Sequence, residues 1–350
     1  MISIRGLSAQ AGSFSIRDIS LDILDSEYFV IVGPTGAGKT ILLECLAGLH
    51  GLRTGEIWID EQDVTSLPPE KRQVGYVPQD YALFPFLDVR DNITFGLRRM
   101  RHSRHGVNGK VESLAHLLGI HHLLDRNVRT LSGGEKQRIA IARALAISPK
   151  MLLLDEPMGS LDVRTAKYLR LELKRFHEEL GITTIHVTHN LIEAEEMAGR
   201  MAIMNAGKIE QIGTPERVFF YPRSAFVSDF IGTPNILDCD HCNDLGHGLM
   251  EAVCGGVPII LPYQGEAVRK IALFPREIYV TVRKPPGPGL NRFRGIVAEI
   301  TPFSSLMKLR IRVGELNLVA ELPQDIFEEM DIKTGQEVFL ILKLRSLKVH

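Results

Sequence analysis

One run of eight residues has the residue types, in the right order, to bind phosphate groups. It consists of Gly33, Pro34, Thr35, Gly36, Ala37, Gly38, Lys39 and Thr40. The glycines let successive backbone N–H groups point at an anion, and the positive end of a helix that follows points to the same place. Lys39 is placed to reach the β- and γ-phosphates, and the Thr40 hydroxyl to ligate Mg²⁺. The run therefore predicts a nucleoside triphosphate site; the alternative is a plain glycine-rich turn.

An acidic pair, Asp155 and Glu156, ends the apolar run 151–154. A continuous apolar run is typical of a strand buried on both faces, which places the pair at the carboxyl end of that strand. Downstream of a phosphate loop, such an aspartate holds Mg²⁺ through its water shell, and such a glutamate orients or deprotonates the attacking water. The pair therefore predicts hydrolysis of the bound triphosphate, with Glu156 as the catalytic base.

Two further polar side chains follow predicted strands. Gln79 follows an apolar segment that begins at Val74, and His189 follows the apolar segment 181–187. The carboxyl ends of strands are where ligands of α/β sheets bind, and a histidine there can hydrogen-bond a γ-phosphate. A lone glutamine or histidine at a strand end is more often structural, so both interpretations stay open on these residues alone.

A second glycine motif, at residues 131–135, lies between the phosphate-binding run and the acidic pair in the sequence. Ser132 and Glu135 have the spacing of a capping box, which by itself predicts only a well-formed helix start. Gly133 and Gly134 expose backbone N–H groups at the positive end of that helix, so the motif also predicts a second anion site. The first loop does not need this site, which therefore can serve a different chain.

Several elements must position these residues. Residues 28–32 form an apolar run before the glycine loop, and helical spacing begins at Ile41 after it. Residues 1–5 and 14–22 alternate apolar with polar, which predicts an antiparallel layer with one covered face. Residues 89–124 have helical spacing, and residues 201–212 predict a closing hairpin. We expect an α/β core with an N-terminal antiparallel β layer and a helical insert.

Bulk composition narrows the class of protein. The 350 residues suffice for two domains. The formal net charge of −1 gives no indication that the protein binds polyanions. The basic run 98–105 has no interleaved aromatic residue, so we interpret it as a solvated face and expect no nucleic-acid partner. Four cysteines do not indicate a disulfide framework. Because no leader and no apolar stretch of about 18 residues is present, we expect a cytosolic protein that would reach a membrane only by docking.

Taken in order along the chain, these motifs resemble those of ABC transporter ATP-binding subunits. The phosphate run, Gln79, residues 131–135, the acidic pair, the turn ending at Asp162, and His189 all match. The resemblance implies a P-loop ATPase at residues 1–232, with a helical subdomain at about 80–148. It implies ATP with Mg²⁺, the metal being held by Thr40, Gln79 and Asp155. It also suggests that Phe14 stacks on the adenine, although its place in a strand favours a core-facing ring.

The same resemblance implies a homodimer with two ATP molecules at its interface. Each ATP would lie between the Lys39 side of one copy and Ser132, Gly133 and Gly134 of the other, with Asp162 nearby. ATP binding would close the dimer, and hydrolysis through Glu156 and His189 would reopen it. Gln79 and the aromatic segment 81–87 would pass this motion to two integral membrane permease subunits, which an extracytoplasmic solute-binding protein serves. We therefore expect the chain at the cytoplasmic face of the cell membrane, although segment 81–87 could also be a local hydrophobic cluster.

The rest of the chain, residues 233–350, consists of short alternating runs separated by Gly and Pro, which predicts an all-β domain. It resembles the OB-like TOBE regulatory domain of ABC importer ATPases, and its ending resembles the oxyanion-binding type of molybdate and tungstate importers. We therefore expect molybdate or tungstate as the solute. The alternatives are import of sulfate, ferric iron, polyamine or sugar, and a soluble ABC ATPase without transport.

Some positions of this tail could bind a small ligand. Candidate donors to an oxyanion are Asn291, Ser304, Ser305 and Lys343. Pro288, Pro323 and Ile326 stand where the resembling proteins usually carry hydroxyl residues, which argues for weak anion sensing. Cys239, Cys242, His247 and Cys254 have the ligand chemistry of a metal site, with ordinary strand cysteines as the alternative.

Overall fold

The computed structural model describes residues 1–99, 104–159, 161–262, 265, 268–287, 289–303 and 306–349. The chain forms two compact units, Met1–Pro215 and Glu216–His350. The domain boundary that the sequence suggested after residue 232 stays a prediction. The basic run 98–105, Ser160, Pro288, Ser304 and Ser305 lie wholly or partly outside the described residues.

A largely parallel sheet forms the centre of the first unit. Its described strands are β3 (Tyr28–Val32), β6 (Val74–Val77), β7 (Met151–Asp155), β8 (Thr183–Thr188), β9 (Arg200–Asn205) and β10 (Lys208–Gly213). They lie in the order β10-β9-β3-β8-β7-β6, and all pairs are parallel except the β9–β10 hairpin. Every residue of β3, β7 and β8 is buried, which explains their continuous apolar runs. The ends of these three strands therefore meet at one edge.

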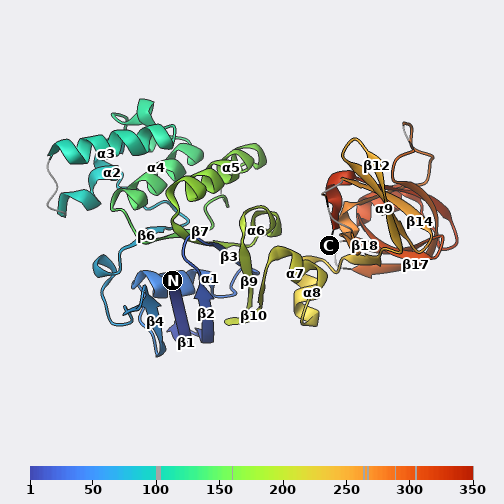
Figure 1. Ribbon diagram of the computed structural model, residues 1–350, viewed down its shortest axis with the longest axis horizontal. Coiled ribbons are helices and arrows are strands. Elements are labelled where there is room, and N and C mark those ends of the chain that lie inside the picture. The colour runs from blue at the N-terminus through green and yellow to red at the C-terminus, as the bar shows by residue number, and fades with distance from the viewer. Residues whose placement is uncertain are drawn as a thin grey trace. The chain divides into compact units, whose positions relative to one another are not determined.

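An antiparallel sheet forms a second layer (Figure 1). Its strands are β1 (Ile2–Ala11), β2 (Phe14–Ile23), β4 (Thr54–Ile59) and β5 (Gln62–Asp63), in the order β2-β1-β4-β5. Helix α1 (Lys39–Ala47) packs between the two sheets, because one hydrophobic cluster joins its leucines to Ile4 and Ile57 on one side and to Leu153 and Ile185 on the other. This packing fixes the helix whose first residues belong to the phosphate loop.

Helices α4 (Gly133–Ala146), α5 (Val163–Leu180) and α6 (Leu191–Met197) cover the opposite face of the parallel sheet. Helices α2 (Val89–Thr94) and α3 (Arg104–Leu117) pack against α4. Ile141 of α4 and Phe176 of α5 meet Leu152 of β7. Short 3-10 helices are η1 (Pro69–Lys71), η2 (Gly96–Arg99), η3 (His121–Leu123) and η4 (Val128–Thr130). None of the described helices has both the length and the apolar character needed to cross a bilayer.

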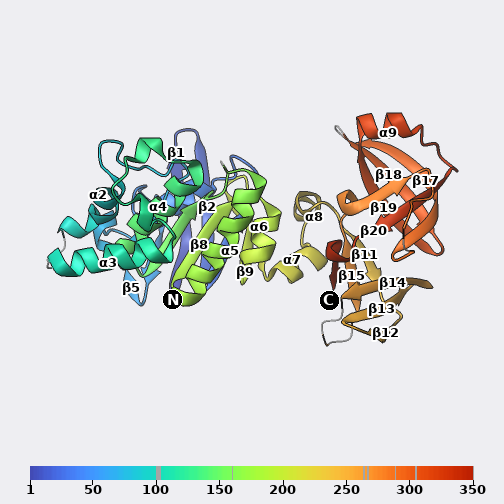
Figure 2. The same ribbon diagram turned by 90° about the horizontal axis from the view of Figure 1, so that it is seen from above.

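The second unit is dominated by antiparallel strands (Figure 2). Its strands are β11 (Asn235–Asp238), β12 (His241–Gly246), β13 (Leu249–Cys254), β14 (Val257–Pro262), β15 (Lys270–Leu273), β16 (Ile278–Thr281), β17 (Arg292–Phe303), β18 (Leu306–Val313), β19 (Leu316–Pro323), β20 (Glu337–Leu342) and β21 (Leu347–Val349). Its described helices are α7 (Pro215–Phe220, which begins at the boundary), α8 (Ala225–Ile231), α9 (Gln324–Met330), η5 (Pro275–Glu277) and η6 (Leu344–Ser346). The sheets are β11-β15-β21, β12-β13-β14 and β16-β20-β17-β18-β19, around a single apolar core. The predicted α/β core with an antiparallel layer and a β-rich tail is confirmed.

Candidate active site

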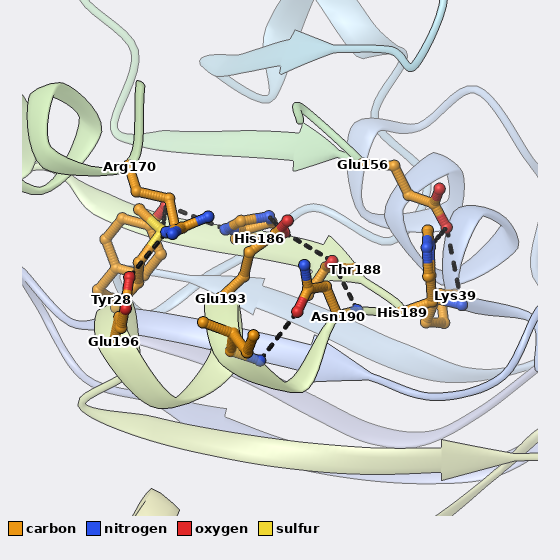
Figure 3. Close-up of polar contacts among 12 residues, drawn as sticks. Tyr28, Lys39, Glu156, Arg170, His186, Thr188, His189, Asn190, Glu193 and Glu196 are labelled. Carbon is orange, nitrogen blue, oxygen red and sulfur yellow. Dashed lines mark hydrogen bonds and ion pairs between the residues drawn. The ribbon is translucent and has the colours of Figure 1, made fainter. Parts of the chain in front are cut away.

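The motif residues of the first unit converge at the carboxyl edge of the parallel sheet. The glycine loop follows β3, the acidic pair ends β7, and His189 follows β8. Strands β3, β8 and β7 are neighbours in the sheet, so residues more than a hundred positions apart lie together (Figure 3). The Lys39 ammonium lies 4.0 Å from Glu156 Oε1, and His189 Nδ1 lies 3.2 Å from the same oxygen. The structure thus brings Lys39, Glu156 and His189 together, and their roles stay a prediction.

The phosphate loop is held in a shape that only small residues allow. Gly38 has φ of 100° and caps the start of α1. A Cβ at Gly33 would lie 2.1 Å from the backbone oxygen of Met204, so the loop depends on glycine there. Lys39 is buried and donates to the backbone oxygens of Gly33 at 2.9 Å and Pro34 at 3.0 Å. Burial lowers the pKa of Lys39, while Glu156 and Asp155 oppose that shift.

Asp155 presents a buried carboxylate beside the loop. Its side chain accepts hydrogen bonds from the Thr40 hydroxyl at 3.2 Å and from the Tyr76 hydroxyl at 3.4 Å. Burial raises the pKa of this carboxyl, because neutral hydroxyls compensate only in part for lost hydration. A cation at this position would gain oxygen ligands and relieve the buried charge. The sequence did not reveal Tyr76, because its contact depends on the parallel register that sets it beside Leu153.

We expect Asp155→Asn to raise the melting temperature of the nucleotide-free protein at neutral pH by a few degrees, at most about 3 °C. Because the pKa of Asp155 is raised, the folded state binds the carboxyl proton more tightly than the unfolded chain does. The stability of the wild type therefore falls as the pH rises from the pKa of the unfolded chain through the pKa of the folded state. Asparagine has no such titration, and its side-chain oxygen accepts from one hydroxyl while its amide N–H donates to the oxygen of the other. The stability gain should therefore shrink as the pH is lowered, while Mg²⁺-dependent ATP hydrolysis is lost at every pH. Thermal unfolding in a pH series tests this, and a variant that is less stable by a pH-independent amount would contradict it.

Glu156 occupies a strained backbone position directly after β7. Its φ of 44° lies in the left-handed region that a glutamate rarely adopts. The strain is held by a hydrogen bond from the Glu156 N–H to the backbone oxygen of Val187, at 2.9 Å, and by one from Gly159 N–H to the Glu156 oxygen, at 3.0 Å. This backbone turns the carboxylate toward Lys39 and His189. Strain of this kind is commonly retained where a side chain must be aimed at a reacting group.

A buried polar network supports the turn that carries His189 (Figure 3). The Thr188 hydroxyl donates to Glu193 Oε2 at 2.7 Å and accepts from the Asn190 N–H at 3.0 Å. His186 Nε2 lies 3.5 Å from the same Glu193 oxygen, and Tyr28 hydroxyl lies 3.1 Å from His186 Nδ1. Sequence reasoning missed this network, because its partners come from β3, β8 and α6. It fixes the turn while leaving the His189 ring exposed.

The second glycine motif begins α4 as a complete capping box. Ser132 N–H and Ser132 Oγ both donate to Glu135 Oε2, at 2.7 and 2.8 Å, and Glu135 N–H donates back to Ser132 Oγ. Gly133 and Gly134 follow as the first helical residues. Among the described residues, no hydrogen bond joins Ser132, Gly133 or Gly134 to residues 33–40. The second anion site that the sequence predicted here stays a prediction.

The remaining candidates occupy distinct places around the edge. Gln79 is exposed and follows β6, the outermost strand on that side. Asp162 caps α5 by accepting from the N–H groups of Arg164 and Thr165, at 3.0 and 3.1 Å. Hydrogen bonds from Thr165 lower the pKa of Asp162.

Phe14 is half-buried against the core, and a Cβ at Gly38 would meet its ring edge at 2.8 Å. Phe14 therefore lies beside the phosphate loop, which leaves both of its predicted roles open.

An aromatic segment lies between Gln79 and α2. The Arg143 guanidinium of α4 holds its backbone by donating to the oxygens of Ala82 and Tyr81, at 2.6 and 2.8 Å. Phe84 packs inward on Phe95 at a ring separation of 4.2 Å. Phe86, by contrast, is 85% exposed. A large apolar side chain presented on an anchored segment is typical of a protein contact surface.

The candidate ligand residues of the second unit are mostly engaged within it. Asn291 is buried and exchanges two hydrogen bonds, each of 2.7 Å, with the backbone of Ile260. Lys343 places its ammonium 4.0 Å from the centre of the Tyr279 ring. Pro323 lies at the start of α9 and Ile326 is exposed on it.

The cysteines of this unit form a close pair rather than a metal group. Cys239 and Cys254 bring their sulfur atoms 3.4 Å apart, while the Cys242 thiol donates to the backbone oxygen of Val268 at 3.3 Å. No third His, Cys, Asp or Glu ligand atom of the described residues lies within 4.8 Å of both paired sulfurs, so His247 does not complete a site. This arrangement favours ordinary cysteines over a metal centre.

Comparison with known proteins adds independent information. The "ABC transporter" family model matches residues 16–159, and the "TOBE domain" model matches residues 287–349. The chain is 41% identical over 100% of both chains to the "Molybdate/tungstate import ATP-binding protein WtpC" of Pyrococcus abyssi. It is 44% identical, over 95% of both chains, to the "Sulfate/thiosulfate import ATP-binding protein CysA" of Burkholderia mallei. The dimeric ATP-binding cassette MJ0796 bound to ADP and Pi superposes with a TM-score of 0.56 and 27% identity, covering 61% of this chain and 99% of that one.

Proposed function

The chain belongs to the family of ABC transporter ATP-binding subunits and is an ATPase of that family, and from this premise we propose that it drives import of a tetrahedral oxyanion. The observation that carries the proposal is the near full-length similarity to import ATP-binding proteins whose printed solutes are molybdate/tungstate or sulfate/thiosulfate. The convergence of Lys39, Asp155, Glu156 and His189 at one sheet edge supports the ATP hydrolysis that would drive this import. The first choice of solute is molybdate or tungstate. The alternative is sulfate or thiosulfate, since relatives with that printed activity are similarly close.

The phosphate loop and Lys39 bind the triphosphate. The backbone N–H groups of residues 33–40 and the start of α1 face the phosphates, and Lys39 exchanges its carbonyl partners for the β- and γ-phosphate oxygens. Mg²⁺ fits the oxygen set of Thr40 and Asp155, with Gln79 completing it from β6, because a buried carboxylate with only hydroxyl partners favours a hard cation. When bound, Mg²⁺ neutralises charge on the phosphates.

Glu156 is the base that takes a proton from the attacking water. Its Oε1 faces both the Lys39 ammonium and His189 Nδ1, so the carboxylate is oriented toward the position of the γ-phosphate. The exposed ring of His189, paired with Glu156 through Nδ1, is proposed to contact the γ-phosphate, and the Thr188–Glu193 hydrogen bond fixes the turn that carries it. Hydrolysis therefore depends on Glu156 and His189, which follow β7 and β8, and on a nucleotide that binds to the loop following β3.

Two copies of the chain complete each site. Ser132, Gly133 and Gly134 start α4 with N–H groups that no described residue of the phosphate loop contacts. A helix start of this kind binds an anion well, and the γ-phosphate held by a second copy is the anion that the family arrangement supplies. Asp162, which caps α5, lies at the same surface of the proposed homodimer. Support comes from the solved cassette MJ0796, which is dimeric.

The aromatic segment 81–87 is the proposed contact with two membrane permease subunits. Phe86 is exposed and the backbone beside it is anchored to α4, so a shift of α4 on nucleotide binding moves this surface. Gln79 joins the segment to the metal site. The chain would then sit at the cytoplasmic face of the membrane, and an extracytoplasmic binding protein would deliver the solute. The β-rich tail is proposed as a regulatory domain, with Lys343 as a remaining candidate donor to an oxyanion.

The proposal is tested by purifying the chain with its membrane partners and binding protein, then measuring ATP hydrolysis in lipid vesicles. Binding protein loaded with molybdate or tungstate should stimulate hydrolysis several-fold, whereas sulfate-loaded binding protein should not. Stimulation by sulfate alone would replace the assigned solute. A failure of every loaded binding protein to stimulate, together with no membrane partner in the purified complex, would overturn the transport role.

A further inference from the structure

A cluster of two histidines and a glutamate lies where the last turns of α3 meet the start of η3. Among the residues that the structure describes, it is the one place where three His, Cys, Asp or Glu ligand atoms lie within 4.8 Å of one another. The three are Glu112, His116 and His121. We propose that these side chains form a binding site for a divalent transition metal ion of the Zn²⁺ type. The proposal is independent of the transported solute and of the ATP site.

The backbone builds this cluster from two elements. Glu112 and His116 are four residues apart on α3, so their side chains share one face of the helix. Gly119 then reverses the chain with φ of 65°, and Ile120 N–H donates to the backbone oxygen of Ala115 at 2.8 Å. This helix end returns His121, at the start of η3, to the last turn of α3. Ile120 is fully buried, which anchors the return.

The side chains are arranged as ligands would be. His116 and His121 stack with ring centres 4.3 Å apart and an angle of 18°, and each offers a ring nitrogen within 4.8 Å of the other ring's nitrogen and of a Glu112 oxygen. His121 Nε2 lies 2.9 Å from Glu112 Oε2. The other oxygen, Oε1, accepts from the Arg90 guanidinium at 2.9 Å, which orients the carboxylate, and a bound ion would replace the contact between Oε2 and His121.

The charge balance suits a cation. Arg90 is shared between Glu112 and Asp125, whose Oδ1 lies 3.6 Å from Arg90 Nε, so two carboxylates face one guanidinium. Glu112, Asp125 and Arg90 together carry a net charge of −1. Two imidazoles and one carboxylate are the donor set of Zn²⁺, Co²⁺ and Ni²⁺, whereas Mg²⁺ prefers oxygen ligands alone. The ion would join α3 to η3, on the segment that leads to the capping box of α4.

The test uses the full-length chain without an affinity tag, freed of metal by a chelator and then titrated with Zn²⁺ by calorimetry in excess Mg²⁺. One Zn²⁺ should bind per chain, and Zn²⁺ should raise the melting temperature by linkage. His116→Ala and His121→Ala should each weaken binding at least about tenfold. His122→Ala, the adjacent residue outside the cluster, is the matched control and should bind as the wild type does.

Spectroscopy separates this site from the thiols of the second unit. Co²⁺ bound by imidazole and carboxylate shows weak visible bands without the near-ultraviolet band of a thiolate ligand, and Cys239→Ser should leave this spectrum unchanged. Glu112→Gln keeps a hydrogen-bond acceptor for Arg90 and provides a second variant if a histidine variant unfolds. Absence of saturable binding would overturn the proposal. So would an equal loss in His122→Ala, or a signal that disappears with Cys239→Ser.

Discussion

Glu156→Gln should lower the rate of ATP hydrolysis by about 100-fold or more, while ATP binding persists. Glutamine has the size of glutamate and still accepts from His189, yet it cannot take a proton from water. The substitution also removes the negative charge next to Lys39, so the Lys39 ammonium should bind the phosphates more strongly. We therefore expect an ATP-bound dimer to accumulate, which size-exclusion chromatography with light scattering would detect beside a phosphate-release assay.

The matched control is Glu178→Gln, which makes the same chemical change at an exposed position of α5. It should hydrolyse ATP at the wild-type rate. If Glu156→Gln kept that rate too, the catalytic assignment would be wrong. If hydrolysis were lost together with ATP binding, Glu156 would be a binding residue and not a base.

The second large effect is expected from Gly134→Asp, within the first turn of α4. An aspartate there would place a carboxylate against the γ-phosphate held by the partner copy. We expect hydrolysis to fall by about 100-fold or more, because the added carboxylate would repel the phosphate at which the backbone N–H groups are aimed. In the Glu156→Gln background, the same change should abolish the ATP-driven dimer while each monomer still binds ATP within about threefold of its original affinity.

Gly134→Asp should still fold, which makes a loss of activity interpretable. An acidic residue in the first helical turn interacts favourably with the helix dipole. A Cβ at Gly134 would meet only the Thr165 methyl group, at 3.1 Å, which can shift slightly. Gly134→Asn is the control of nearly equal size without the charge, and it should retain much more dimerisation. Equal loss in both variants would point to steric blocking, and no loss in either would remove α4 from the nucleotide site.

Local chemistry explains which parts of this fold could be predicted from the sequence. The glycine loop before α1 and the capping box of Ser132 and Glu135 each depend on residues within a few positions of one another, and both are present as predicted. The buried strand before Asp155 was also recognisable, because a strand covered on both faces has a continuous apolar run. These elements sufficed to place the catalytic edge.

Contacts set by sheet register could not be predicted in the same way. Tyr76 reaches Asp155 only because β6 and β7 pair in parallel, and His186 meets Glu193 only because α6 returns over β8. The left-handed backbone of Glu156 has no signature in its own residue type. The His116 and His121 cluster was missed for a related reason, because a helix end reverses the chain between them. In the tail, alternation indicated strands but not their order.

The most direct measurement is a structure of the Glu156→Gln protein solved with ATP and Mg²⁺. The account predicts a dimer with two ATP molecules, each bound by Lys39 of one copy and by the partner's Ser132 and the partner's Gly134. A nucleotide bound by one copy alone, with the start of α4 far from any phosphate in either copy, would contradict it.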